Sequence, residues 1–213
     1  YQPLSIELPA NSHTIQGLAL KIEVRAWQVG VISVLARVAF EDKKLAELTP
    51  MHAAILDDGT SLSSYAQQVC RDVCRNLEGL LIKPSPENLP EAYTVFCVTD
   101  IENQTDVLRW RDGNSEAIAA LLTETDEPEK LSTEQIQGVM RIQASFEKSD
   151  LVVIDWDSAI VIDLKGYVDD VLYVLELANL QVEEFRVMDS ELDKHLERTY
   201  DFVEQDRFQL MGK

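Results

Sequence analysis

Residues 151–163 read LVVIDWDSAIVID, and this stretch decides the fold. Mostly apolar strand signals at 151–155 and 159–164 lie on either side of a turn formed by Asp155 to Ser158. This pattern is typical of two strands joined by a hairpin turn. Another short strand signal, at 143–147, precedes them. We therefore expect an antiparallel meander over residues 143–164, with Trp156 packing beside its turn.

Toward the N-terminus, hydrophobic alternation from Leu18 and an apolar run at 31–40 predict a hairpin that turns near Gly30. A third β-rich run covers 93–98. Helices are predicted at 41–48, 49–56, 61–81, 115–122 and 132–141, whereas 103–112 is ambiguous. The helix at 61–81 follows from apolar residues at spacings of three and four. The fold class is α+β: a mostly antiparallel sheet of five to six strands packed with helices, plus a long C-terminal helix. The expected body is 1–166, with a loose lead-in at 1–17.

The C-terminal segment 167–213 is expected to form that long helix, because residues 167–206 contain neither Gly nor Pro. A heptad pattern runs along it, with a-type positions Val168, Leu175, Val182, Asp189, Leu196 and Val203, and d-type positions Val171, Ala178, Phe185, Leu192 and Thr199. The first half is apolar around much of its circumference, so we expect it to pack on the body.

Beyond Asp189 the apolar residues narrow to a stripe with charged flanks, which suits contact with another helix. That helix belongs either to this chain's own body, to a second copy, or to another protein. The candidate interaction residues are Leu192, Leu196, Tyr200 and Val203. The expected partnership is a homo-oligomer or a partner helix.

Composition restricts the partners further. The chain has 38 Asp and Glu against 19 Lys and Arg, a net charge of −19, which repels nucleic acid and anionic lipid surfaces. No apolar run approaches the ~20 residues that span a bilayer, so we expect no membrane contact by this segment. Three cysteines without framework spacing favour the cytoplasm. The absence of an initiator Met suggests a piece of a longer protein.

Asp155 and Asp157 are the candidate metal ligands, because an apolar strand that ends in Asp-x-Asp is how some Mg²⁺-dependent phosphotransferases begin their site. The competing interpretation is a plain hairpin turn, since only about fifty residues, mostly helix, follow the motif. Asp169 and Asp170 are expected in the first turn of the long helix. We expect no cofactor, because no Gly-rich phosphate loop is present.

Cysteine and histidine add no catalytic arrangement. Cys70 and Cys74 share a predicted helix face without a complementary CxxC pair, so we expect them to be small core residues. The three histidines, His13, His52 and His195, are scattered along the sequence. None of them forms a recognisable Ser/His/Asp or metal-binding motif with its neighbours.

The stretch LVVIDWDSAIVID together with VLYVLELANLQVEEFRVMDSELDKHLERTYDFV resembles the domain of unknown function of the "required for meiotic nuclear division" proteins and their bacterial relatives. The resemblance covers about residues 150–205. It implies a non-enzymatic scaffold, the soluble head of a membrane-anchored protein on the cytoplasmic side of a membrane. The leading hypothesis is thus an interaction or scaffold domain; the alternative is a Mg²⁺-dependent phosphohydrolase that uses Asp155 and Asp157.

Overall fold

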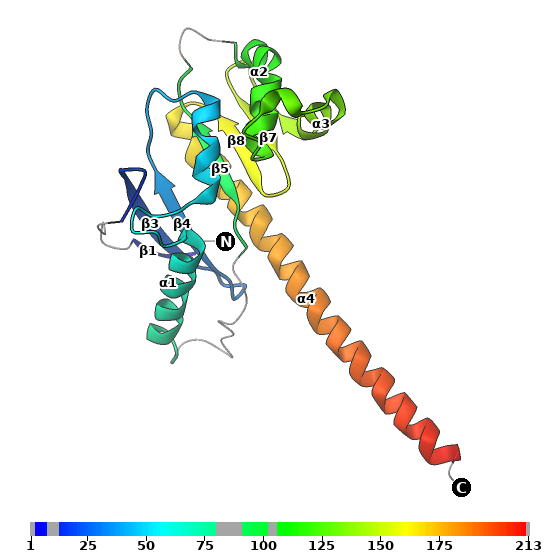
Figure 1. The fold of residues 1–213 in the computed structure, drawn as a ribbon. Coiled ribbons are helices and arrows are strands. Elements are labelled where there is room, and N and C mark those ends of the chain that lie inside the picture. The colour runs from blue at the N-terminus through cyan, green and yellow to red at the C-terminus, as the bar shows by residue number, and fades with distance from the viewer. Residues whose placement is uncertain (1–2, 8–12, 80–90, 102–105, 212–213) are drawn as a thin grey trace. The chain divides into compact units, whose positions relative to one another are not determined.

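The structure, a computed structural model, describes residues 3–7, 13–79, 91–101 and 106–211, and for 201–211 it describes the backbone only. It divides into two compact units, Tyr1–Tyr173 and Val174–Lys213. The first unit contains two β-sheets and their helices, and the second is the remainder of the long helix α4 (Lys165–Met211) (Figure 1). The expected α+β class and the single long helix are confirmed.

The first sheet is built around β3 (Leu18–Ala26), which pairs antiparallel with β1 (Leu4–Glu7), β2 (Thr14–Ile15) and β4 (Ile32–Val38). The predicted hairpin is confirmed as β3–β4, and Gly30 lies in its turn with a φ of 89°. The predicted loose lead-in at 1–17 is wrong where it is described, because β1 and β2 are strands. The sequence did not predict either strand, because both are short and are stabilised by pairing with β3 rather than by a local pattern.

The second sheet has the strand order β5-β8-β7-β6. Its members are β5 (Thr94–Val98), β6 (Gln143–Ala144), β7 (Leu151–Ile154) and β8 (Ser158–Ile162). The meander β6–β7–β8 is antiparallel as predicted, while β5 runs parallel to β8. The expected single sheet of five to six strands is therefore wrong: the described residues form two sheets of four strands each.

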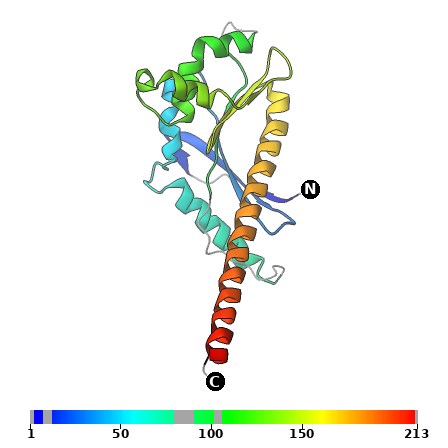
Figure 2. The same ribbon diagram turned by 90° about the vertical axis from the view of Figure 1, so that its right-hand side faces the viewer.

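Each sheet has its own helices. Helix α1 (Leu62–Asn76) contributes Val69 and Val73 to the core of the first sheet. Helices α2 (Val107–Leu122) and α3 (Thr133–Val139) lie together on one face of the second sheet (Figure 2). Ser132 and Gln135 form a capping box that opens α3, within the helix predicted at 132–141. The ambiguous residues 103–112 contain the start of α2, which Asp106 caps; 103–105 are outside the described residues.

Two short 3₁₀ helices lie between β4 and α1. The predicted helices at 41–48 and 49–56 shrink to η1 (Leu45–Glu47) and η2 (Thr49–Ala53), and a third turn, η3 (Pro128–Lys130), precedes α3. Ala54 ends η2 in the left-handed conformation, with φ 43°. The segment joins the two cores, because Leu48 is buried in the second and Met51 packs against both.

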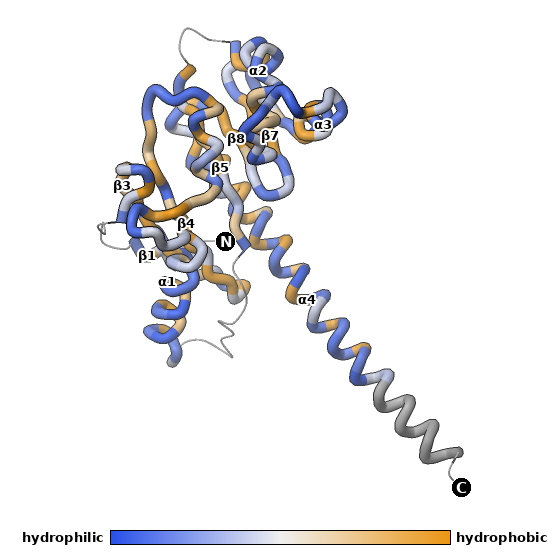
Figure 3. Tube along the Cα trace, in the orientation of Figure 1, coloured by the Kyte–Doolittle hydropathy of each residue, from blue (hydrophilic) through white to orange (hydrophobic). Residues whose placement is uncertain are grey.

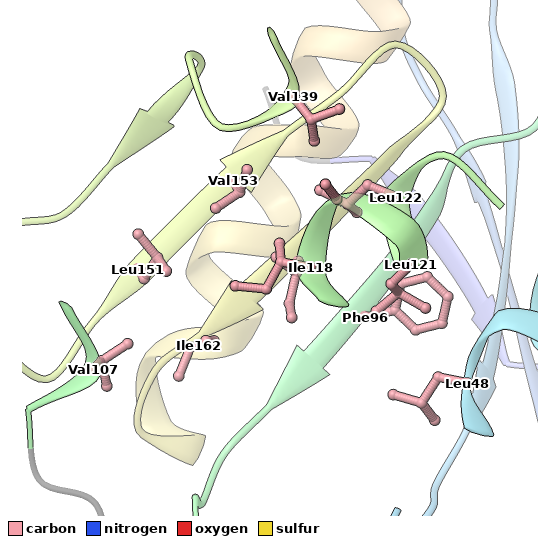
Figure 4. Close-up of a cluster of buried hydrophobic side chains, with 12 residues drawn as sticks. Leu48, Phe96, Val107, Ile118, Leu121, Leu122, Val139, Leu151, Val153 and Ile162 are labelled. Atoms are coloured by element: carbon pink, nitrogen blue, oxygen red, sulfur yellow. The ribbon is translucent and has the colours of Figure 1, made fainter. Parts of the chain in front are cut away.

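The core of the second sheet forms where α2 covers the strands. Ile118, Leu121 and Leu122 of α2 meet side chains from β5, β7 and β8, among them Phe96, Leu151 and Ile162 (Figure 4). All of these side chains are at most 4% exposed. Burying one such side chain contributes about 1.5–3 kcal/mol, so this helix is held mainly by its packing on the sheet.

The carboxyl end of α2 is capped by groups from distant segments. The Thr125 and Glu124 amides donate to the Ala120 and Leu121 carbonyls, the pattern of a Schellman motif, with Glu124 in the left-handed position at φ 54°. The Ser158 hydroxyl donates to the Leu122 carbonyl at 2.9 Å, and His52 Nε2 lies 2.8 Å from the Leu121 carbonyl. Buried carbonyls that α2 cannot satisfy alone therefore find partners in η2 and β8.

Helix α4 begins in the first unit. It starts at Lys165, so Asp169 and Asp170 lie one turn further in than the first turn that the sequence suggested. Asp169 accepts a hydrogen bond of 2.6 Å from Arg37 of β4, and Tyr173 packs on Trp27 with ring centroids 5.9 Å apart. The helix has 47 residues, or about 70 Å of length. The packing of its first half on the body remains a prediction.

Candidate functional site

The first candidate is the turn at Asp155–Ser158, which joins β7 to β8. The Asp155 amide donates to the Ser158 carbonyl at 2.8 Å, which closes the predicted hairpin turn. The Thr94 amide donates to the Asp157 carbonyl at 3.0 Å. Tyr93 donates its hydroxyl to the carbonyls of Ser158 and Asp155, at 2.9 and 3.2 Å. The backbone of the turn is thus fastened to the start of β5.

The tyrosine at this turn has a shifted pKa. Burial raises the pKa of Tyr93 to about 12, and the neighbouring carboxylates of Asp155 and Asp157 add to the rise. Among the residues that the structure describes, no three His, Cys, Asp or Glu side chains form a group that could hold a metal ion. Trp156 is 88% exposed, so its predicted packing beside the turn is wrong. The local geometry is that of a structural corner.

The cysteine pair lies on α1, as the spacing indicated. Burial raises the pKa of the Cys70 thiol to about 11, and the neighbouring Cys74 raises it further. Burial likewise raises the pKa of Cys97, on β5, to about 11. Because the thiolate is the form that attacks carbon and binds metal, thiols with raised pKa values are poor nucleophiles and ligands.

A small hollow lies between η1, η2 and the carboxyl end of α2, lined by residues that include Thr49, Ala120 and Asp126. Its volume is about 30 Å³, which is room for a few water molecules. Pockets for small-molecule ligands usually measure about 300–1,000 Å³. Nearby, His52 Nδ1 lies 3.1 Å from a Glu124 carboxylate oxygen, and the ring packs edge-on against Phe96. The His52 side chain is only 4% exposed, so it acts as packing and as a cap for α2.

The second unit presents the other candidate, a row of apolar side chains on α4. We call Val182, Phe185, Met188, Leu192, Leu196 and Tyr200 the α4 stripe. They are exposed in the structure, from 47% for Leu196 to 71% for Tyr200. Figure 3 shows the corresponding alternation of hydrophobic and hydrophilic residues along α4. With Val203 the stripe repeats every 3.5 residues on average from Val182, the coiled-coil period.

Three of the four residues predicted to make contacts belong to this stripe. Of the predicted interaction residues, Leu192, Leu196 and Tyr200 are exposed on α4, whereas the side chain of Val203 is outside the described residues. Charged residues cover the opposite face of the helix, where Lys194 pairs with Glu191 at 2.8 Å. The sequence predicted charged flanks for the stripe. It did not single out that Arg186 and Asp193 share heptad position e, although the heptad register places both there.

None of the helices in the described residues has the length and hydropathy to cross a membrane. No solved structure matches the chain. A curated relative, "Uncharacterized protein MJ0711" of Methanocaldococcus jannaschii, is 21% identical over 177 residues, which make up 83% of this chain and 48% of the relative. The chain therefore spans about half the length of that protein.

These comparisons correct the resemblance seen in the sequence. Residues 1–169 match the family described as "Uncharacterized protein MJ0711, N-terminal domain", and no "required for meiotic nuclear division" family or bacterial relative is indicated. The earlier likeness rested on a strand pair that leads into a leucine-rich helix, which is a common local pattern. The expectation of a membrane anchor came from that resemblance and has no support from these comparisons. The matched residues include both sheets and end early in α4, and the chain belongs to the family of the MJ0711 N-terminal domain.

Proposed function

We propose that this protein is a non-enzymatic association domain in which the α4 stripe binds another helix. The observation that carries the proposal is the exposure of six apolar side chains at coiled-coil spacing over residues 182–200. Contiguous apolar surface of this kind marks an interaction site in soluble proteins. The stripe is narrow and has charges beside it, so a second helix fits it better than a flat surface does.

The non-enzymatic part of the proposal is supported by the structure around three alternative sites: the turn at 155–158, the hollow beside α2 and the cysteine thiols. The backbone carbonyls at Asp155, Asp157 and Ser158 are engaged by Tyr93, Thr94 and Asp155 within the fold. The described hollow beside α2 is smaller than a ligand pocket. The Cys70 and Cys97 thiols have pKa values raised to about 11. These observations support structural roles for the backbone of the turn and for the Cys70 and Cys97 thiols.

The location of the protein is also a proposal. All three cysteines are free, which suits the reducing cytoplasm. The net charge of −19 disfavours direct binding to nucleic acid or to anionic lipid, so the expected partner is a protein.

Position-specific photo-crosslinking tests the association. A photoreactive amino acid replaces Leu192, on the stripe, in the full chain within cells that produce it. The matched control replaces Lys194, which lies on the opposite face two residues away. We expect an intermolecular adduct from position 192 and none from position 194. Equal adducts from both positions, or only intramolecular products from position 192, would refute the proposed function.

A further inference from the structure

We infer that the helix bound by the α4 stripe belongs to a second copy of this chain and runs antiparallel to the first, with its midpoint between Ser190 and Glu191. The inference rests on the proposed function and names its partner. It comes from the side chains that each possible pairing of two α4 helices would bring face to face. Only residues 181–200 are needed, and their side chains are all described.

The parallel arrangement has an unfavourable core. Two parallel helices in register place each a and d residue opposite its own copy. Asp189 occupies an a position, so two carboxylates would face each other between the helices. Like charges directly opposed in a partly desolvated seam disfavour the complex. No parallel e–g contact offers an opposite-charge pair in return, because position g carries Gln181, Met188 and His195.

The antiparallel arrangement does not place the two Asp189 carboxylates directly opposite each other. With the midpoint between Ser190 and Glu191, Phe185 lies level with Leu196 of the second copy and Asp189 with Leu192 of the second copy. Val182 lies level with Thr199 of the second copy, whose hydroxyl already donates to the His195 carbonyl in its own helix. Each contact occurs twice because the pair has twofold symmetry. The overlap covers residues 181–200, about 30 Å of helix.

Charge complementarity supports the same register. Arg186 and Asp193 both occupy position e, and antiparallel helices bring their e positions together. Arg186 therefore faces Asp193 of the second copy on both sides of the midpoint. Arg186 is 47% exposed and lies 3.5 Å from Glu183 of its own helix. A guanidinium has five N–H donors in a planar fork, so it can hold more than one carboxylate at once.

The test is a charge swap in the full chain, followed by sedimentation analysis. We expect the wild type to form dimers with a dissociation constant on the order of 10 µM. Arg186→Glu or Asp193→Arg places like charges together twice in each dimer, so each variant should weaken association at least about tenfold. The double variant restores opposite charges and should return to within about threefold of the wild type.

An equimolar mixture of the two single variants distinguishes the helix direction. In the antiparallel pair, the Arg186→Glu copy presents two carboxylates at its e positions, and the Asp193→Arg copy presents two guanidinium groups to them. The mixture should therefore dimerise as the wild type does. The control is Arg198→Glu, the same charge change at position c away from the stripe, which should leave association within about threefold. Circular dichroism checks that each variant keeps its helix content.

The outcomes separate this inference from the proposed function. A wild type that stays monomeric at all concentrations overturns the second-copy inference, while a position-192 adduct to a different protein would leave the association function standing. The antiparallel register is overturned if the charge swaps leave the dissociation constant of the dimer unchanged. It is also overturned if the two single variants do not dimerise with each other.

Discussion

Two helices of this protein contain similar apolar residues in opposite surroundings. Helix α2 ends in five consecutive residues, Ile118 to Leu122, that are at most 3% exposed. Between residues 182 and 200 of α4, the side chains of the stripe are 47% to 71% exposed. The apolar content of a helix therefore does not determine whether it is buried. What differs is the partner: α2 has a sheet over its apolar face, and the α4 stripe lies in a unit of its own.

The hydrogen bonds and ion pairs of the two helices also differ. Carbonyls at the carboxyl end of α2 accept hydrogen bonds from side chains of η2 and β8, which are distant from α2 in the sequence. Between residues 182 and 200 of α4, the side-chain contacts include local ion pairs, such as Arg186 with Glu183 and Lys194 with Glu191. Such exposed pairs contribute only about 0.2–0.5 kcal/mol each. The first two of the four predictions that follow test this contrast, and the last two test the turn between β7 and β8.

Removing a core side chain from α2 should have the largest effect. Ile118→Ala leaves a cavity at a residue with 0% exposure and should lower the free energy of unfolding by about 2–5 kcal/mol. The matched change on α4, Leu192→Ala, should cost less than about 0.5 kcal/mol at concentrations where the protein is monomeric. Denaturation in urea measures both. Equal losses would mean that the stripe is part of the folded core.

Removing one cap of α2 should have the next largest effect. In Ser158→Ala the Leu122 carbonyl keeps its burial and loses the hydroxyl that donates to it, which should cost about 1–3 kcal/mol of unfolding free energy. Ser149→Ala, on an exposed loop, should change stability by less than about 0.5 kcal/mol. Similar values for the two variants would show that water replaces the hydroxyl in the capping role.

Tyr93 makes the stability of the hairpin turn depend on alkaline pH. Its folded pKa of about 12 exceeds the ordinary value of 10.0, so the neutral hydroxyl is favoured by folding. The resulting stabilisation is complete below pH 10 and is lost as the pH rises from about 10 to 12. Tyr93→Phe should be about 1 kcal/mol less stable at neutral pH. The difference between wild type and Tyr93→Phe should shrink across that window, and a constant difference would contradict this assignment.

The smallest effect is expected for the acidic pair of the same turn. Asp157→Asn removes a carboxylate that helps to raise the Tyr93 pKa, so the phenol should ionise at a lower pH in ultraviolet absorbance. Stability at neutral pH should change by less than about 0.5 kcal/mol. Adding Mg²⁺ should change the melting temperature of neither the wild type nor the variant. A melting temperature that rises with Mg²⁺ only in the wild type would restore the metal-site alternative.

Local patterns predicted much of this fold. The β3–β4 hairpin, helix α1, the capping box of α3 and the β6–β7–β8 meander each follow from neighbouring residues, because a turn, a cap or a periodic apolar face is encoded within a few positions. The parallel pairing of β5 with β8 joins residues about sixty positions apart, and no local signal specifies it. The role of His52 at the end of α2 is equally non-local.

For the candidate site, too, the sequence predicted the residues but not what they contact. The narrowed apolar stripe indicated Leu192, Leu196 and the flanking Tyr200 as contact residues on the long helix, and all three are exposed in the structure. The same stripe is compatible with burial on the chain's own body, because periodicity identifies a face and not its partner. Trp156 illustrates the reverse case: its aromatic ring suggested packing, yet it lies in a turn and stays largely exposed among the described residues.

The shared end of α2 makes the two sheets one cooperative unit. His52 follows the first sheet in sequence, Ser158 opens the last strand of the second, and both bond to adjacent carbonyls of the same helix. Leu48 and Met51 reinforce the link by packing into the second core. A fragment that contains only one sheet would expose these carbonyls and lose part of its core. The first unit should therefore melt in a single calorimetric transition, and its two halves should not fold apart from each other.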